Sequence, residues 1–194
     1  MFELRYSTPD LWAKTVISGM DEFLPDHASA EYKASGMAMS MALHYKDKPR
    51  LVGAMIDLAI EELAHFREVV KIMEDRGLIL QKDEKDPYVN GLRHQMRKGT
   101  EFYFLDRLLI GAIVEARGAE RFGMIATSLG ADPSLADLKT FYQRITRSED
   151  KHYELFLDLA ATYFAEKEIQ PRLDQLLDIE ASLVAELPLR PRLH

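Results

Sequence analysis

The sequence contains no cysteine. This absence excludes disulfide bridges, thiolate metal sites and iron–sulfur clusters held by the chain's own residues. Long apolar runs are missing too, because none approaches the roughly 18 residues that a membrane-spanning helix needs. The opening MFELRYSTPD lacks the basic and apolar segments of a secretory signal. We therefore expect a cytoplasmic protein that is not associated with a membrane.

Basic residues are in the minority. The chain has 25 Lys and Arg against 32 Asp and Glu, which gives a formal net charge of −7 at pH 7. This balance argues against a protein coated with basic residues for non-specific nucleic-acid binding, although it allows a local positive patch. The other totals, 194 residues with 47% hydrophobic and 29% charged, are ordinary for a globular protein. We predict one domain that comprises residues 1–194.

Sustained alternation of apolar and polar residues, which would indicate strands, is nearly absent, and helical periodicity dominates. Proline and glycine divide the chain into helical segments. A long connection at about 78–99 contains a short helix that starts at Asp86-Pro87, and Thr100 is the expected N-cap of the segment after it. The main segments are predicted at about 8–19, 25–45, 49–77, 100–129, 133–165 and 171–187.

The four long segments form two pairs. Each pair has a short turn between its helices, and the long connection joins one pair to the other. This is one of the two standard connectivities of four-helix bundles. We predict an all-α four-helix bundle with one long crossover, a core over about 22–165, and extra helices at both ends, the C-terminal one at about 171–187.

Acidic residues interrupt the apolar stripe of every long helix. The segment AIEELAHFREVV (59–70) carries a Glu and a His three residues apart, at positions where a buried helix should carry apolar side chains. The segment from Pro133 repeats this Glu-x-x-His pattern, and the other two helices each carry a single Glu. Residues i and i+3 share a helix face, so each pair points toward the core. The residues concerned are Glu31, Glu62, His65, Glu115, Glu149 and His152.

Such burial needs compensation, because an isolated carboxylate in an apolar core costs several kcal/mol. One Glu from each of two helices plus a Glu-x-x-His pair from each of the other two is the ligand set of ferritin-like di-iron and di-manganese proteins. Oxygen and nitrogen donors with open positions suit iron(II) and oxygen chemistry. We therefore predict two iron ions, or manganese, at these six residues. A metal-free bundle whose buried charges specify helix pairing is the alternative.

Four segments resemble the family of tRNA 2-methylthio-N6-isopentenyladenosine hydroxylases. They are DHASAEYKA (26–34), EELAHFREV (61–69), LDRLLIGAIVEARGAERF (105–122) and FYQRITRSEDKHYELFLDLA (141–160). The resemblance spans about residues 8–165, and Glu-Ala-Arg-x-x-Glu-Arg-Phe from Glu115 is its most specific part. All six predicted ligands fall on the family's ligand pattern.

The resemblance implies a reaction and its partners. Dioxygen and two electrons would convert the isopentenyl group of a modified adenosine, just 3′ of the tRNA anticodon, to its hydroxylated form. The electrons would come from an external reductase or ferredoxin. An acidic chain needs a local positive patch to bind the anticodon stem-loop. The densest cluster lies in the crossover, and we predict Arg93, Arg97 and Lys98 as RNA contacts, with the neighbouring His94. Further candidates are Arg117, Arg121, Arg144 and Arg147, for which structural ion pairs are the alternative.

Other functions would use the same ligands. A ferroxidase or a rubrerythrin-like peroxide scavenger needs the six residues but no RNA. A quinone-precursor hydroxylase at a membrane surface would need an exposed apolar helix, and the acidic residues of the predicted C-terminal helix suit an anionic membrane poorly.

Overall fold

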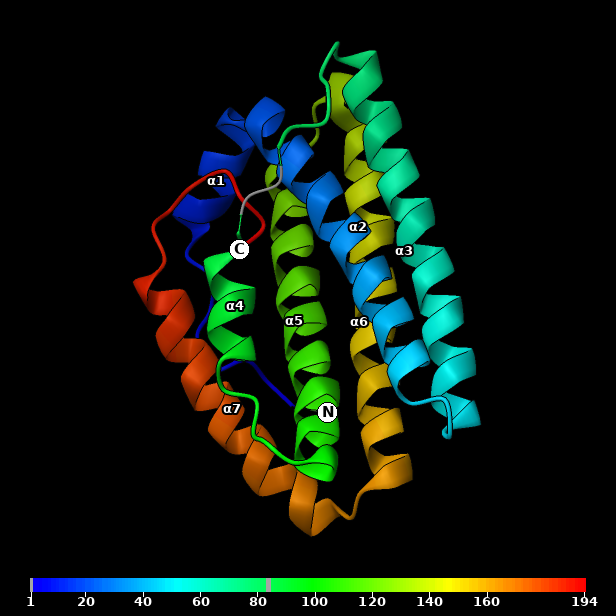
Figure 1. The fold of residues 1–194 in the computed structure, drawn as a ribbon. Helices are drawn as coiled ribbons and strands as arrows, with labels where there is room; N and C mark the ends of the chain where they lie inside the picture. Colours follow the sequence, from blue (N-terminus) through cyan, green and yellow to red (C-terminus); the bar gives the residue numbers. More distant parts are fainter. Residues whose placement is uncertain (1, 83–84) are drawn as a thin grey trace. The chain divides into compact units, whose positions relative to one another are not determined.

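The computed structural model describes residues 2–82 and 85–194, and every regular element in these ranges is helical. The prediction of an all-α chain is therefore confirmed. Figure 1 shows the elements in order. They are α1 (Asp10–Ser18), α2 (Met20–His44), α3 (Pro49–Asp75), α4 (Pro87–Arg93), α5 (Thr100–Ser128), a 3₁₀ turn (Pro133–Leu135), α6 (Ala136–Tyr163) and α7 (Glu166–Glu186). In the part of the chain described here, no helix combines the length and hydropathy required to cross a bilayer.

The chain forms two compact units. One, the α2–α3 unit, runs from Ser18 into the crossover and includes Pro191–Leu193. The other, the α5–α6 unit, consists of the segment up to Ile17, residues Lys85–Arg190, and His194. Each unit contains one of the predicted helix pairs. That residues 1–194 form one domain stays a prediction.

Helices α2 and α3 pack against each other along their length in the α2–α3 unit (Figure 1). Small residues of α2 allow this approach: the Ser35 hydroxyl donates a 3.0 Å hydrogen bond to the Ala59 carbonyl of α3. The predicted start of α2 at Pro25 is wrong, because the helix begins at Met20 and Pro25 lies inside it. Proline there removes one backbone hydrogen bond, but Phe23, in the turn before it, is fully buried and anchors that turn.

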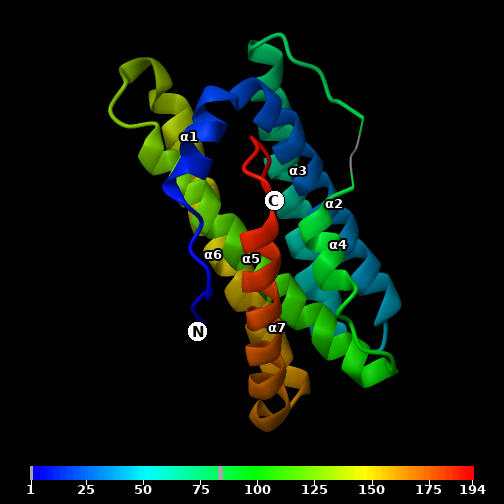
Figure 2. The ribbon, with the colours of Figure 1, turned by 90° about the vertical axis from the view of Figure 1, so that its left-hand side faces the viewer.

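Helices α5 and α6 are the long pair of the α5–α6 unit. They approach closely at Gly111, where a Cβ would lie 2.8 Å from the ring of Phe156. Helix α7 packs on α5 and α4 (Figure 2). Its predicted start at Pro171 is also wrong: α7 begins at Glu166, and the Glu168 carboxylate accepts a hydrogen bond from the Ala165 N–H, which caps the helix.

The crossover agrees with the prediction of a short helix. Asp86 caps α4, since its Oδ1 accepts hydrogen bonds from the backbone N–H groups of Tyr88 (2.8 Å) and Val89 (3.1 Å). Thr100 is not the cap of α5 as predicted. Gly99 holds that position with φ 100°, a conformation that a residue with a Cβ rarely adopts, and Thr100 becomes the first helical residue.

Candidate metal centre

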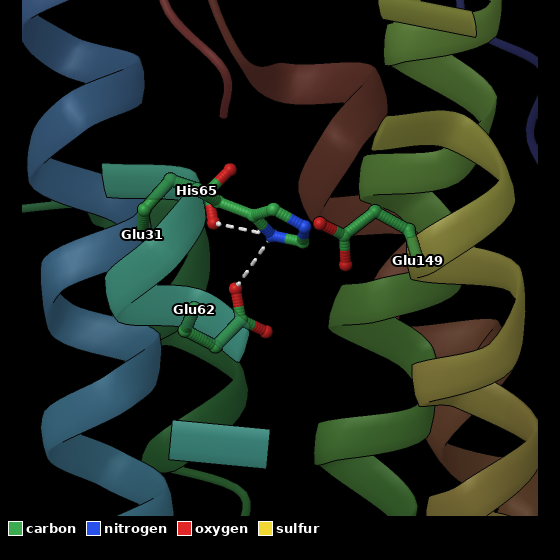
Figure 3. Close-up of side chains that lie close together, drawn as sticks. All are labelled: Glu31, Glu62, His65 and Glu149. Atoms are coloured by element: carbon green, nitrogen blue, oxygen red, sulfur yellow. Dashed lines mark hydrogen bonds and ion pairs between the residues drawn. The ribbon is translucent and has the colours of Figure 1, made fainter. Parts of the chain in front are cut away.

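The α2–α3 unit brings three predicted ligands together. Glu31 comes from α2, Glu62 and His65 come from α3, and all three are buried. Each offers one ligand atom, and these atoms lie within 4.8 Å of one another. Figure 3 shows Nδ1 of His65 facing both carboxylates, 3.6 Å from Glu31 Oε2 and 3.4 Å from Glu62 Oε2. The stripe positions that the sequence marked as anomalous therefore meet at one point between the two helices.

His27 fixes one of these carboxylates. Its Nε2 lies 2.6 Å from Oε1 of Glu31, one helical turn later, and His27 is fully buried. Burial would raise the pKa of Glu31, but hydrogen bonds with His27 and His65 outweigh it and hold that pKa well below its ordinary value. Glu31 is therefore an oriented carboxylate anion, which is the form that binds a metal. The sequence analysis did not identify this contact, although the i,i+4 spacing from His27 to Glu31 could have indicated it.

The carboxylates of Glu31 and Glu62 also favour the protonated form of His65. Burial would lower the pKa of His65, but hydrogen bonds with Glu31 and Glu62 raise it to about 9. A proton on this imidazole offsets part of the negative charge of the two buried carboxylates. Metal ligation requires the neutral imidazole, so an ion would displace that proton as it binds.

The α5–α6 unit contains a second triad of the same composition. Glu115 comes from α5, and Glu149 and His152 come from α6; all three are buried, and one ligand atom of each lies within 4.8 Å of the others. Nδ1 of His152 is 3.3 Å from Glu149 Oε2. A Cβ at Gly118 of α5 would meet Cγ of Glu149 at 3.9 Å, so the carboxylate-bearing side chain lies directly against α5.

The donors of both triads fit a divalent transition metal. Each triad consists of two carboxylates and one imidazole, which is the mixed oxygen and nitrogen set that iron(II) and manganese(II) accept. Thiolates, which would favour zinc or copper(I), do not occur in the chain. A bound cation would offset the charge of the two buried carboxylates that each triad brings together. Each triad is therefore a candidate metal site, and ligation by these six residues stays a prediction.

The predicted RNA contacts differ in their surroundings. Arg93 and Lys98 are exposed. Arg97 is partly buried, because its guanidinium forms a 2.7 Å ion pair with Asp106 Oδ1, and its backbone N–H donates a 2.7 Å hydrogen bond to Asp106 Oδ2. Arg93 and Lys98 are thus exposed cations, whereas the partly exposed side chain of Arg97 belongs to a structural ion pair with Asp106.

Two further candidates for RNA contact lie in the interior. Arg117 is fully buried and donates hydrogen bonds from Nε (2.8 Å) and Nη2 (3.0 Å) to the carboxylate of Glu180 on α7. It also pairs with Glu120. Arg121 is buried, with its guanidinium 5.0 Å from the ring centroid of Trp12. Arg117 and Arg121 are therefore not surface cations, and for Arg117 the ion-pair interpretation is correct.

Comparisons with known proteins agree on one family. A family model described as tRNA-(MS[2]IO[6]A)-hydroxylase (MiaE) matches residues 2–194. A Pseudomonas putida protein named tRNA 2-(methylsulfanyl)-N(6)-isopentenyladenosine(37) hydroxylase is 32% identical over 187 residues, which cover 96% of this chain and 89% of that protein. A Salmonella typhimurium protein of the same name is 32% identical over 173 residues, which cover 88% of this chain and 60% of the Salmonella protein.

A solved structure extends the likeness to three dimensions. It is titled "Protein 43 with aldehyde deformylating oxygenase activity from Synechococcus". The two chains are 31% identical, with a TM-score of 0.91, and the match covers 100% of this chain and 96% of that one. This likeness to a ferritin-like oxygenase confirms the predicted fold class.

Proposed function

Because this chain belongs to the tRNA-(MS[2]IO[6]A)-hydroxylase (MiaE) family, we propose that it is an oxygen-dependent monooxygenase acting on tRNA. The substrate is the isopentenyl group of 2-methylthio-N6-isopentenyladenosine in the anticodon loop. One observation carries the proposal: a chain that matches this family over residues 2–194 contains two buried Glu-Glu-His triads with the donors of an oxygen-activating metal pair.

The two triads would hold two iron ions, with manganese as the alternative. Glu31, Glu62 and His65 would hold one ion, and Glu115, Glu149 and His152 would hold the other. When bound, the pair supplies the activation of dioxygen. His27 keeps Glu31 anionic and oriented, so its loss should weaken metal binding about 10–100-fold, as for other residues that orient ligands. The exposed His44, on the same helix, provides the control variant for that comparison.

The reaction needs partners beyond the chain. One oxygen atom of dioxygen is inserted into a C–H bond of the isopentenyl group, and the other leaves as water with two electrons and two protons. The chain has no cysteine to hold an iron–sulfur carrier, so a reductase or ferredoxin delivers the electrons. The target adenosine lies in a single-stranded loop, where turning a base out of the stack costs less than in a duplex. We place the protein in the cytoplasm with its tRNA.

The predicted cations in the crossover are the proposed contacts to RNA phosphates. Arg93 and Lys98 are exposed, so they can release counterions on binding. Arg97 also has a structural role, because its guanidinium is paired with Asp106. Reversal of charge at Arg93 and Lys98 should weaken RNA binding and leave iron content unchanged. Reversal at Arg97 would also disturb the ion pair with Asp106, so it is the less informative variant.

A single-turnover assay tests the function. Iron-loaded, chemically reduced protein is mixed with oxygen and an isopentenylated anticodon stem-loop RNA, and the nucleoside should gain one oxygen atom. Glu149→Gln should lose both iron and activity. Glu154→Gln, on the exposed side of the same helix, should keep both. A reduced, iron-loaded wild type that leaves the RNA unchanged but oxidises free iron(II) or reduces peroxide would favour the ferroxidase or rubrerythrin-like alternative.

A further inference from the structure

Two aromatic side chains at the start of α5 are exposed to solvent. Phe102 is 57% exposed and Tyr103 is 36% exposed. They belong to a continuous exposed run from Lys98 to Tyr103. Exposed large apolar residues are common one at a time, so this pair alone decides nothing. Its surroundings distinguish it.

An arginine lies over each ring. The guanidinium carbon of Arg97 is 4.8 Å from the ring centroid of Phe102, and that of Arg107 is 5.9 Å from the centroid of Tyr103. Both distances are within the range of a cation–π interaction. Gly99 supports the Phe102 ring from the backbone, since a Cβ at Gly99 would lie 3.6 Å from Phe102 Cδ2. The two rings and the two arginines thus form an ordered surface on which aromatic and cationic groups lie side by side.

A buried carboxylate, that of Asp106, holds Arg97 in place on this surface. Asp106 is fully buried and accepts hydrogen bonds from the Arg97 guanidinium and backbone. The same carboxylate accepts hydrogen bonds from Arg172 of α7, at 2.9 Å from Nε and 2.8 Å from Nη2. Arg97 is therefore a positioning residue: a buried carboxylate fixes its guanidinium against Phe102. A surface fixed in this way loses little side-chain entropy when a ligand binds.

The local charge fits an anionic ligand. Residues 93–107 contain four Lys or Arg against two acidic residues, in a chain whose net charge is −7. One of the two acids is Asp106, which is buried and paired. Rings and guanidinium planes stack with unpaired bases, and positive charges attract the phosphates between them.

We infer that Phe102 and Tyr103, with Arg97 and Arg107, form a stacking platform for unpaired bases of the anticodon arm. This inference rests on the proposed function, because it takes the partner to be the substrate RNA. Twelve residues of α5 separate Tyr103 from the ligand Glu115, which is about 18 Å at 1.5 Å per residue. The platform therefore holds nucleotides other than the adenosine that is hydroxylated.

Binding of stem-loop RNA to the iron-loaded protein without oxygen tests the platform. Phe102→Ala and Tyr103→Ala should each weaken binding about 5- to 150-fold, the range found for loss of one base–aromatic stack. Phe102→Trp should retain binding, whereas Phe102→Leu, which is apolar but cannot stack, should not. Leu43→Ala, at a residue 62% exposed on α2, is the matched control and should bind as wild type does.

Three further measurements separate stacking from other roles. Iron content and the unfolding midpoint should be unchanged in Phe102→Ala, because the ring is exposed and remote from the proposed metal ligands. Its binding should keep the salt dependence of wild type. Lys98→Ala should instead reduce the slope of log K against log salt by about 0.7, the value for one phosphate of a single strand.

The outcomes distinguish the platform from the function. If wild type hydroxylates the RNA while Phe102→Ala and Tyr103→Ala bind it normally, the platform is wrong and the function stands. Equal binding by Phe102→Leu and Phe102→Trp would also overturn stacking. If Phe102→Ala binds RNA normally but accepts electrons poorly from a physiological donor, the surface is a protein-docking site and the inference fails. A wild type that neither binds nor hydroxylates the RNA removes both proposals.

Discussion

Glu180 offers the sharpest test of how the α5–α6 unit is stabilised. Its carboxylate is fully buried and accepts hydrogen bonds from Arg117 at 2.8 and 3.0 Å and from the Tyr88 hydroxyl at 3.0 Å. Burial first, and then the charge of Glu180, raise the pKa of Tyr88 well above its ordinary value, so that hydroxyl remains a donor. Three donors from two other elements thus converge on one carboxylate of α7.

Glu180→Gln keeps the shape of the side chain and removes its charge. The amide presents one acceptor oxygen, and its NH₂ group must face a donor of Arg117 or Tyr88. Arg117 is fully buried and pairs with two carboxylates, Glu180 and Glu120. The variant would remove the charge of Glu180, which is fully buried, and leave only that of Glu120, which is partly exposed. Removing one partner of such a buried pair costs about 3–5 kcal/mol. For a chain of this length we expect the melting temperature to fall by roughly 6–20 °C.

Thermal and urea unfolding, followed by circular dichroism, would measure the loss. The control is Asp178→Asn on the same helix, where Asp178 is 72% exposed and pairs with Arg5 across 2.5 Å. Solvent screens that pair, so the control should unfold close to wild type. A second variant, Arg117→Met with Glu180→Leu, should be less destabilised than the sum of its single changes. Unfolding of Glu180→Gln within about 1 kcal/mol of wild type would refute the assignment of the pair as a stabilising contact, because the buried Arg117 would then need no counter-charge other than Glu120.

Two further predictions use matched changes. Gly111→Ala places a Cβ 2.8–3.0 Å from the Phe156 ring and should destabilise the protein by about 1–3 kcal/mol. At Gly36 a Cβ meets nothing within 4 Å, so Gly36→Ala should stabilise α2 by about 0.5–1 kcal/mol. Equal effects of the two changes in unfolding experiments would contradict the close packing of α5 and α6. Asp86→Asn should keep the cap of α4 but lose the ion pair with His194. Burial would raise the pKa of Asp86, but His194 and backbone N–H groups lower it from 3.8 to about 2. This carboxylate therefore contributes stability that is complete above about pH 4 and is lost as the pH falls toward 2. The variant should be less stable by about 1–2 kcal/mol at pH 5 and approach wild type as the pH falls to 2. A difference that does not depend on pH would exclude the ion pair as its cause.

The buried positions of the Glu-x-x-His pairs could be predicted from the sequence because their signal is local. Glu62 and His65 interrupt an apolar stripe on a single helix, and the same pattern in α6 identifies Glu149 and His152. A helix has a fixed period, so a polar residue on its buried face is visible without knowledge of its neighbours. The helix order and the all-α class follow from the same periodicity.

Helical periodicity did not predict the first residues of two helices, or the ion pairs between residues far apart in the sequence. Pro25 and Pro171 were interpreted as first residues, yet both lie inside helices whose first turns are stabilised by other contacts. Arg117 and Glu180 are 63 residues apart, and each resembles an ordinary charged residue of an amphipathic helix. Only the packing of α7 on α5 makes them a buried pair, and no local pattern encodes that contact.

Charge balance distinguishes the two kinds of buried polar cluster in this protein. Asp106 faces the guanidinium groups of Arg97 and Arg172, and Glu180 faces Arg117, so each of these buried carboxylates has a cationic partner on the chain and acts as a structural contact. Each triad instead places two buried carboxylates beside its one imidazole, and in the first triad His27 adds a second imidazole beside Glu31. Carboxylates gathered in a dry interior are costly, so a bound cation or the uptake of a proton would stabilise such a site. The lowered pKa of Glu31 favours its anionic form, which is the form that a bound cation would require.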